Sequence, residues 1–82
     1  MNFRDPETRQ KMARKGWAFT FMPDYDYYSK STKAISIDIF DQNAKGITML
    51  VIGTYYSEIE VPMVSFDAAL RAANALLAGG VK

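Results

Sequence analysis

The sequence predicts a small α+β domain: a short N-terminal helix, a three- to four-stranded antiparallel sheet and a C-terminal helix packed on one sheet face. The chain has 82 residues, which is enough for one core. Apolar residues recur at every second position through the middle of the chain and at helical spacing near its C-terminus. We therefore expect a single domain over 1–82, with a basic helix over 1–16, a sheet over 17–64 and an amphipathic helix over 65–79.

The first helix is predicted by its two ends. Asp5 is a good N-cap residue, and Gly16 is a typical residue for ending a helix. The segment between them offers little apolar surface, so a helix of this length is marginal by itself. We expect it to dock through Phe3 and Met12, to pair with a partner, or to fray.

The middle region predicts strands separated by polar turns. Residues 17–22 alternate, and their aromatic residues share one face. Residues 23–32 are polar and tyrosine-rich, which predicts a loop. A second strand follows with its isoleucines facing inward, and the turn residues of 41–46 predict a hairpin connection. The first expected strand places Trp17, Phe19 and Phe21 on one face. The second places Ile35, Ile37 and Ile39 on its inward face.

The third expected strand, over 47–56, is apolar on both faces, which is typical of a central strand covered on both sides. A fourth strand is expected over 58–64, where Pro62 restricts it to an edge or shortens it. The last helix carries a continuous apolar stripe. We expect one face of the sheet to bury the isoleucines against Leu70, Ala73 and Leu77 of this helix. We expect the other face to be covered by a partner, because it is apolar around Leu50, Ile52, Tyr55 and Tyr56.

The absence of cysteine and histidine excludes several function classes. It rules out disulfides, zinc held by Cys or His, haem and iron–sulfur attachment, a cysteine nucleophile and any triad built on histidine. Asp24 and Asp26 have the spacing that opens a calcium loop, but Tyr28 takes the next ligand position and no glycine follows. We therefore expect no enzyme, no cofactor and no metal.

Two tyrosine clusters predict a protein-binding surface. Tyrosine is common at interfaces because it combines a large, stiff contact area with a polar tip. A solvated loop has no folding reason for three aromatic rings, although rings that fold back over the sheet would give the same sequence. The expected protein-binding residues are Asp24, Tyr25, Asp26, Tyr27, Tyr28, Tyr55 and Tyr56.

The sequence thus predicts a non-enzymatic binding protein that acts through protein–protein contacts. Acidic groups beside tyrosines suit a basic protein surface, such as one that normally holds nucleic acid. We expect a small inhibitor or adaptor of a nucleic-acid-handling complex. A second copy of the chain is the other expected partner, because a chain this small gains core by forming a homodimer.

The alternative is a domain that binds single-stranded or double-stranded nucleic acid. Residues 1–15 carry a net charge of +3 and the rest of the chain a net charge of −2. The aromatic sheet face of the first strand would stack on bases, and basic side chains would contact phosphates. The basic residues of this alternative are Arg4, Arg9, Arg14, Lys15, Lys30 and Lys33.

The expected location is the cytoplasm. Residues 1–15 have no apolar run and do not resemble a signal peptide. The apolar stretch 47–52 is too short to span a bilayer. Identity of the partner and oligomeric state are left open by the sequence.

Overall fold

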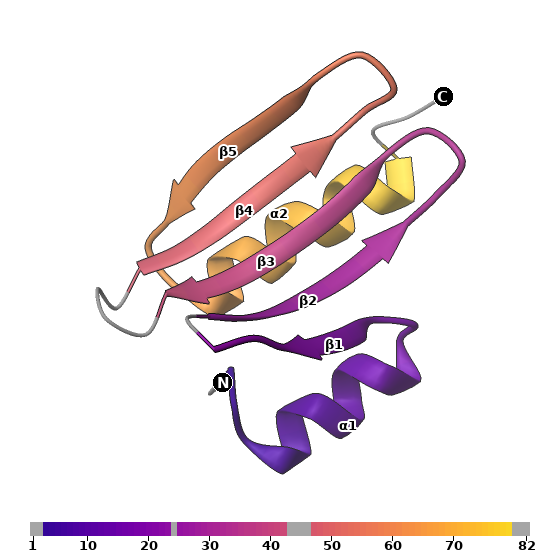
Figure 1. The fold of residues 1–82 in the computed structure, drawn as a ribbon. Helices are drawn as coiled ribbons and strands as arrows, with labels where there is room; N and C mark the ends of the chain where they lie inside the picture. The colour runs from indigo at the N-terminus through magenta and orange to yellow at the C-terminus, as the bar shows by residue number, and fades with distance from the viewer. Residues whose placement is uncertain (1–2, 24, 43–46, 80–82) are drawn as a thin grey trace.

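The computed structural model describes residues 3–23, 25–42 and 47–79. The strands form one antiparallel sheet in the order β1-β2-β3-β4-β5, with α2 across one face and α1 beside β1 (Figure 1). This confirms the α+β class, with five strands in place of the expected three to four. The elements are α1 (Pro6–Arg14), β1 (Ala18–Phe21), β2 (Asp26–Ser31), β3 (Ser36–Gln42), β4 (Ile47–Gly53), β5 (Glu58–Met63) and α2 (Phe66–Gly79).

The additional strand is β2, which occupies most of the segment expected to be a loop. That expectation is wrong because β2 pairs on both sides, with β1 and with β3, so its backbone polar groups have partners in spite of its polar composition. Its side chains alternate strictly. Tyr28 is fully buried between Phe19 on β1 and Ile39 on β3, while its neighbour Tyr27 points to the other side of the sheet.

The strand expected over 47–56 ends at Gly53, because a turn begins at the next residue. Gly53 pairs with Ser36 on β3, and a Cβ atom at position 53 would lie 2.7 Å from the Ser36 Oγ atom. Strand β5 then forms one edge of the sheet, as Pro62 predicts. Of the connection expected over 41–46, residues 43–46 lie outside the described part of the chain.

The core lies between the sheet and the two helices. One row of paired residues runs across all five strands on this side: Phe19, Tyr28, Ile39, Leu50 and Val61. From above it, α2 contributes Phe66, Ala69, Leu70 and Ala73, all buried, and Leu77, which is partly buried. The predicted burial of Ile35, Ile37 and Ile39 beneath this helix is confirmed.

The assignment of β4 side chains to the two faces is corrected by the register. Leu50 pairs with Ile39 and Ile52 pairs with Ile37, so both lie on the side that α2 covers. Met49 and Val51 therefore face the opposite side. Both faces of β4 are apolar, as expected, so the pattern contains no signal for which face the helix covers. None of the helices in the described part of the chain is long and apolar enough to cross a membrane.

Helix α1 docks at the end of the core through Phe3 and Met12, as expected, and both side chains are buried. The Trp17 backbone N–H donates to the Met12 carbonyl, and Gly16 between them has φ +90°, a conformation that favours glycine. The chain thereby reverses from α1 into β1. Trp17 packs in the same core.

Candidate protein-binding surface

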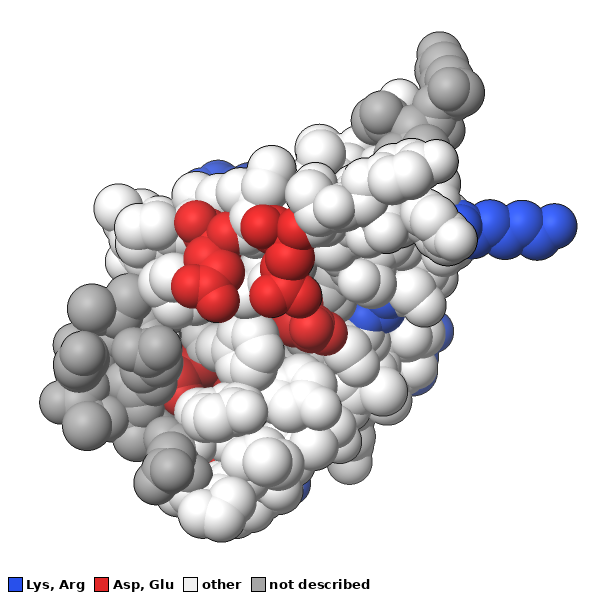
Figure 2. All heavy atoms as spheres, turned by 45° about the horizontal axis from the view of Figure 1, so that its top comes forward, with Lys and Arg blue, Asp and Glu red and all other residues white. Residues whose placement is uncertain are grey.

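The sheet face opposite α2 is not covered by either helix (Figure 1). Because strand residues alternate between faces, this open face is formed by the residues between the core positions. Figure 2 shows acidic residues gathered on this side, with uncharged residues around them and basic residues toward the margins. Its described residues are Ala18, Thr20, Tyr27, Ser29, Ser31, Ser36, Asp38, Phe40, Met49, Val51, Gly53, Glu58, Glu60 and Pro62.

One half of the open face is acidic. Asp38 on β3 and Glu60 on β5 pair with Val51 from its two sides, and Glu58 pairs with Gly53 one row further along. The open-face strand residues listed above include no lysine or arginine. Partial burial raises the pKa of Asp38 above its ordinary value, and the negative charge of Glu58 raises it further. A cationic group placed over this half would favour the charged carboxylate and so act against both effects.

The other half is aromatic. The ring centroids of Tyr25 and Tyr27 lie 5.1 and 5.0 Å from that of Phe40, and the two tyrosine rings lie 6.1 Å apart. A hollow of about 220 Å³ lies beside them, lined by Tyr25, Phe40, Met49, Val51 and Glu60. This volume is below the range of about 300–1,000 Å³ that is typical of small-molecule sites. The hollow is better matched to one side chain of a protein partner.

The turn between β4 and β5 presents Tyr55 and Tyr56 away from the sheet. Their side chains are 91% and 92% exposed, and their rings pack edge to face with centroids 5.0 Å apart. Thr54 fixes this turn: its Oγ1 atom accepts hydrogen bonds from the backbone N–H groups of Tyr56 and Ser57, and its own N–H donates to the Ser57 carbonyl. The tyrosine pair is therefore held on an ordered hairpin tip.

The turn between β2 and β3 uses the same device. The Thr32 Oγ1 atom accepts from the N–H groups of Ala34 and Ile35, each at 3.2 Å. Both turns lie at the same end of the sheet, and a hollow between them is lined by residues of both, including Lys33 and Tyr55. Lys33, a predicted phosphate contact, thus lies at this tip and away from α1.

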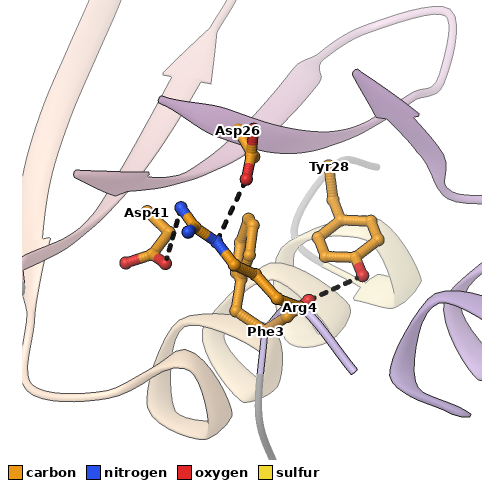
Figure 3. Close-up of polar contacts among 5 residues, drawn as sticks. All are labelled: Phe3, Arg4, Asp26, Tyr28 and Asp41. Carbon is orange, nitrogen blue, oxygen red and sulfur yellow. Dashed lines mark hydrogen bonds and ion pairs between the residues drawn. The ribbon is translucent and has the colours of Figure 1, made fainter. Parts of the chain in front are cut away.

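Two predicted contact residues, Tyr28 and Asp26, are buried, and Figure 3 shows their polar contacts with the N-terminal segment. The Tyr28 hydroxyl donates to the Phe3 carbonyl at 2.9 Å. Asp26 is 2% exposed, and its Oδ2 atom lies 3.1 Å from Arg4 Nε, while Arg4 Nη2 lies 3.5 Å from Asp41 Oδ2. These contacts fasten the N-terminal segment to β2 and β3. The sequence gives no indication of this pairing because the partners lie more than twenty residues apart along the chain.

Of the other predicted residues, Asp24 lies outside the described part of the chain. Tyr25 and Tyr27 lie on the open face, and Tyr55 and Tyr56 form the hairpin tip. Sequence reasoning missed the residues that complete the open face: Asp38, Phe40, Met49, Glu58 and Glu60. A signal was present in the alternation of β3, where Asp38 and Phe40 are the neighbours of the buried Ile39 and so face the other side of the sheet.

The basic residues of the nucleic-acid alternative are distributed over different parts of the fold. Arg9, Arg14 and Lys15 are exposed on or just after α1, and the Arg9 guanidinium lies 5.5 Å from the centroid of the Phe19 ring. The Lys30 Nζ atom donates to the Lys15 carbonyl at 2.6 Å. The structure does not show the open aromatic face that this alternative uses: Trp17, Phe19 and Phe21 are on the covered side, where Trp17 is buried, Phe19 is partly buried and Phe21 is exposed at the margin.

The acidic side chains do not converge on a point. Within the described residues, no three Asp or Glu side chains are grouped closely enough to hold a metal ion. The sequence matches no protein family model, and no curated protein or solved structure is significantly similar to it.

Proposed function

We propose that this protein is a non-enzymatic binding protein whose open face docks on a positively charged surface of another protein. The observation that carries the proposal is the composition of that face, where a carboxylate half adjoins an aromatic half and neither helix covers them. The described strand residues there include no basic side chain. A face of this kind repels nucleic acid and attracts lysine and arginine.

The two halves have different roles in such an interface. The aromatic half, with Tyr25, Tyr27 and Phe40, supplies the large and stiff contact area that dominates binding energies. The acidic half, with Asp38, Glu58 and Glu60, directs the encounter and selects basic partners. Basic surfaces of this kind are typical of proteins that handle nucleic acid, so we propose a role as a small inhibitor or adaptor of such a complex.

A second candidate function is nucleic-acid binding through α1. It is favoured by the exposure of Arg9, Lys11, Arg14 and Lys15 along that helix and the turn after it. This alternative uses a different part of the molecule from the open face. It predicts an affinity that falls steeply with salt and depends on the helix and not on Glu58 or Glu60.

The test is a binding measurement with immobilised deca-arginine, because arginine both pairs with carboxylates and stacks on aromatic rings. The double substitution Glu58→Gln with Glu60→Gln should weaken binding about fivefold, as expected for two exposed ion pairs. Tyr25→Ala should weaken it by a similar factor. A matched control, Asp5→Asn with Glu7→Gln, removes two charges from the start of α1 and should change the affinity less than twofold.

An equal loss in both double variants would show attraction to net charge and would contradict a specific surface. An immobilised single-stranded oligonucleotide serves as the second probe. The α1 alternative would be favoured if the protein binds this oligonucleotide tightly and if Arg9→Gln with Arg14→Gln abolishes that binding. Under this alternative, Glu58→Gln with Glu60→Gln leaves the binding unchanged.

A further inference from the structure

Strand β5 is an edge that no described strand or helix closes. It pairs with β4 over six residues and has no strand on its outer side (Figure 1). Alternate residues of an edge strand direct their N–H and C=O groups outward, where another extended chain can pair with them. The opposite edge, β1, is only four residues long and is flanked by α1. Of the two edges, β5 offers the longer and more accessible row of backbone groups.

The side chains of β5 divide by charge between the two faces of the sheet. Glu58 and Glu60 point to the open face and are exposed. On the other face Ile59 is 56% exposed and Val61 is partly buried, because α2 lies mainly over β3 and β4. A strand placed beside β5 would therefore meet carboxylates on one side and aliphatic side chains on the other.

A second copy of the same strand fits this edge poorly. In an antiparallel pair, directly opposite residues lie on the same face of the sheet. If two β5 strands paired over most of their length about a twofold axis, glutamates of the two copies would lie opposite or diagonal to one another, and like charges there are destabilising. Pro62 lacks an N–H group to donate, so any strand added at this edge lacks that one hydrogen bond, whether it is a second copy or a partner segment. Like charge and proline at an edge are known to oppose self-pairing.

We propose that β5 captures an extended segment of the partner protein as a sixth strand, and that this segment alternates basic with β-branched apolar residues. The inference rests on the proposed function and adds to it the mode of binding. Main-chain hydrogen bonds along β5 supply affinity, and the alternation supplies specificity. The basic side chains pair with Glu58 and Glu60, while the apolar ones cover Ile59 and Val61.

The experiment titrates ¹⁵N-labelled protein with the acetylated and amidated hexapeptide Lys-Val-Lys-Val-Lys-Val and follows the amide resonances. Two control peptides carry the same charge: one groups the three lysines before the three valines, and one has two alternate backbone amides N-methylated. Strand addition predicts shifts of the amide resonances of 58–61 and 63 and slower exchange of outward amides there. Each control should bind about tenfold more weakly, because the grouped peptide cannot match its side chains to the two faces of β5 and the N-methylated peptide loses ladder hydrogen bonds.

A charge swap keeps the test independent of any one variant. The variant Glu58→Lys with Glu60→Lys should no longer bind the lysine peptide and should bind the peptide Glu-Val-Glu-Val-Glu-Val instead. If the grouped and N-methylated peptides bind as well as the parent, strand addition is overturned while the proposed function stands, provided that Glu58→Gln with Glu60→Gln still weakens them all. If no basic peptide binds at the open face or β5, both proposals fail.

Discussion

Asp38 shows how a single residue links the stability of the fold to its surface. Burial, together with the negative charge of Glu58, raises the pKa of Asp38 above its ordinary value. The folded state therefore keeps this proton to a higher pH than the unfolded chain does. The unfavourable contribution of Asp38 to stability is absent well below about pH 4 and grows as the pH rises through the raised pKa.

The variant Asp38→Asn tests this sign. Its melting temperature should exceed that of the wild-type protein at pH 7, and the difference should shrink as the pH is lowered toward about 3, where the aspartate is protonated. Thermal unfolding followed by circular dichroism at several pH values measures it. If the variant is less stable than the wild type at pH 7, interactions of the charged Asp38 with its neighbours stabilise the fold by more than burial of the charge destabilises it.

Tyr28 is the residue whose hydroxyl ties the N-terminal segment to the sheet. Tyr28→Phe keeps the buried ring and leaves the Phe3 carbonyl without its donor. We expect a loss of about 1–2 kcal/mol in the free energy of unfolding, the usual cost of an unsatisfied buried acceptor. Chemical denaturation followed by the fluorescence of Trp17 measures it. The control Tyr55→Phe removes an exposed hydroxyl, and its free energy of unfolding should equal that of the wild type.

At the scale of the elements, the two described glycines that end helices differ in what they require. Gly16 has φ +90°, so Gly16→Ala places a side chain in a strained backbone conformation and should cost about 1–2 kcal/mol of stability. Gly79 is the last residue of α2, and a Cβ atom there would meet nothing within 4 Å. Gly79→Ala should leave stability unchanged or raise it by up to about 1 kcal/mol.

Equilibrium unfolding of Gly16→Ala and Gly79→Ala, each compared with the wild-type protein, measures the two changes in stability. A loss of stability in Gly79→Ala equal to that in Gly16→Ala would show that the positive φ is not the cause. The two helices also differ in what holds them. Helix α2 is held by burial of an apolar stripe that is evident from the sequence. The packing of α1 depends on Met12, on Phe3 and on the contacts of the segment before the helix.

At the scale of the whole molecule, charge is separated between two regions. The α1 region is basic, and the open face with its β5 edge is acidic. A homodimer stays a prediction, but pairing through β5 is opposed by Glu58 and Glu60. The double substitution Glu58→Thr with Glu60→Thr removes that repulsion and introduces residues that favour strands.

We therefore expect this variant to self-associate with increasing concentration, to a higher mass than the wild-type protein has under the same conditions. Size-exclusion chromatography with light scattering measures the mass. Asp5→Asn with Glu7→Gln, which loses the same charge elsewhere, should keep the wild-type mass. If the threonine variant also keeps it, the two glutamates do not control the edge.

The described part of the candidate surface was only partly predictable. Tyr25, Tyr27, Tyr55 and Tyr56 were expected contacts and are placed on the open face or the hairpin tip. Tyr28, in the same cluster, is buried. Sequence pattern does not separate neighbouring tyrosines on one strand, because their faces depend on the register with β1 and β3.

The α+β class, the positions of both helices and the strands with clear apolar alternation can be predicted from the sequence alone. These features depend on apolar periodicity and on the residues that begin or end an element, and both signals lie within short segments of the chain. The existence of strand β2 and the choice of the face that α2 covers follow only from contacts in the folded molecule. A polar strand is stabilised by pairing on both sides, and a strand that is apolar on both faces is oriented by the helix that packs on it, so each depends on residues distant in the chain.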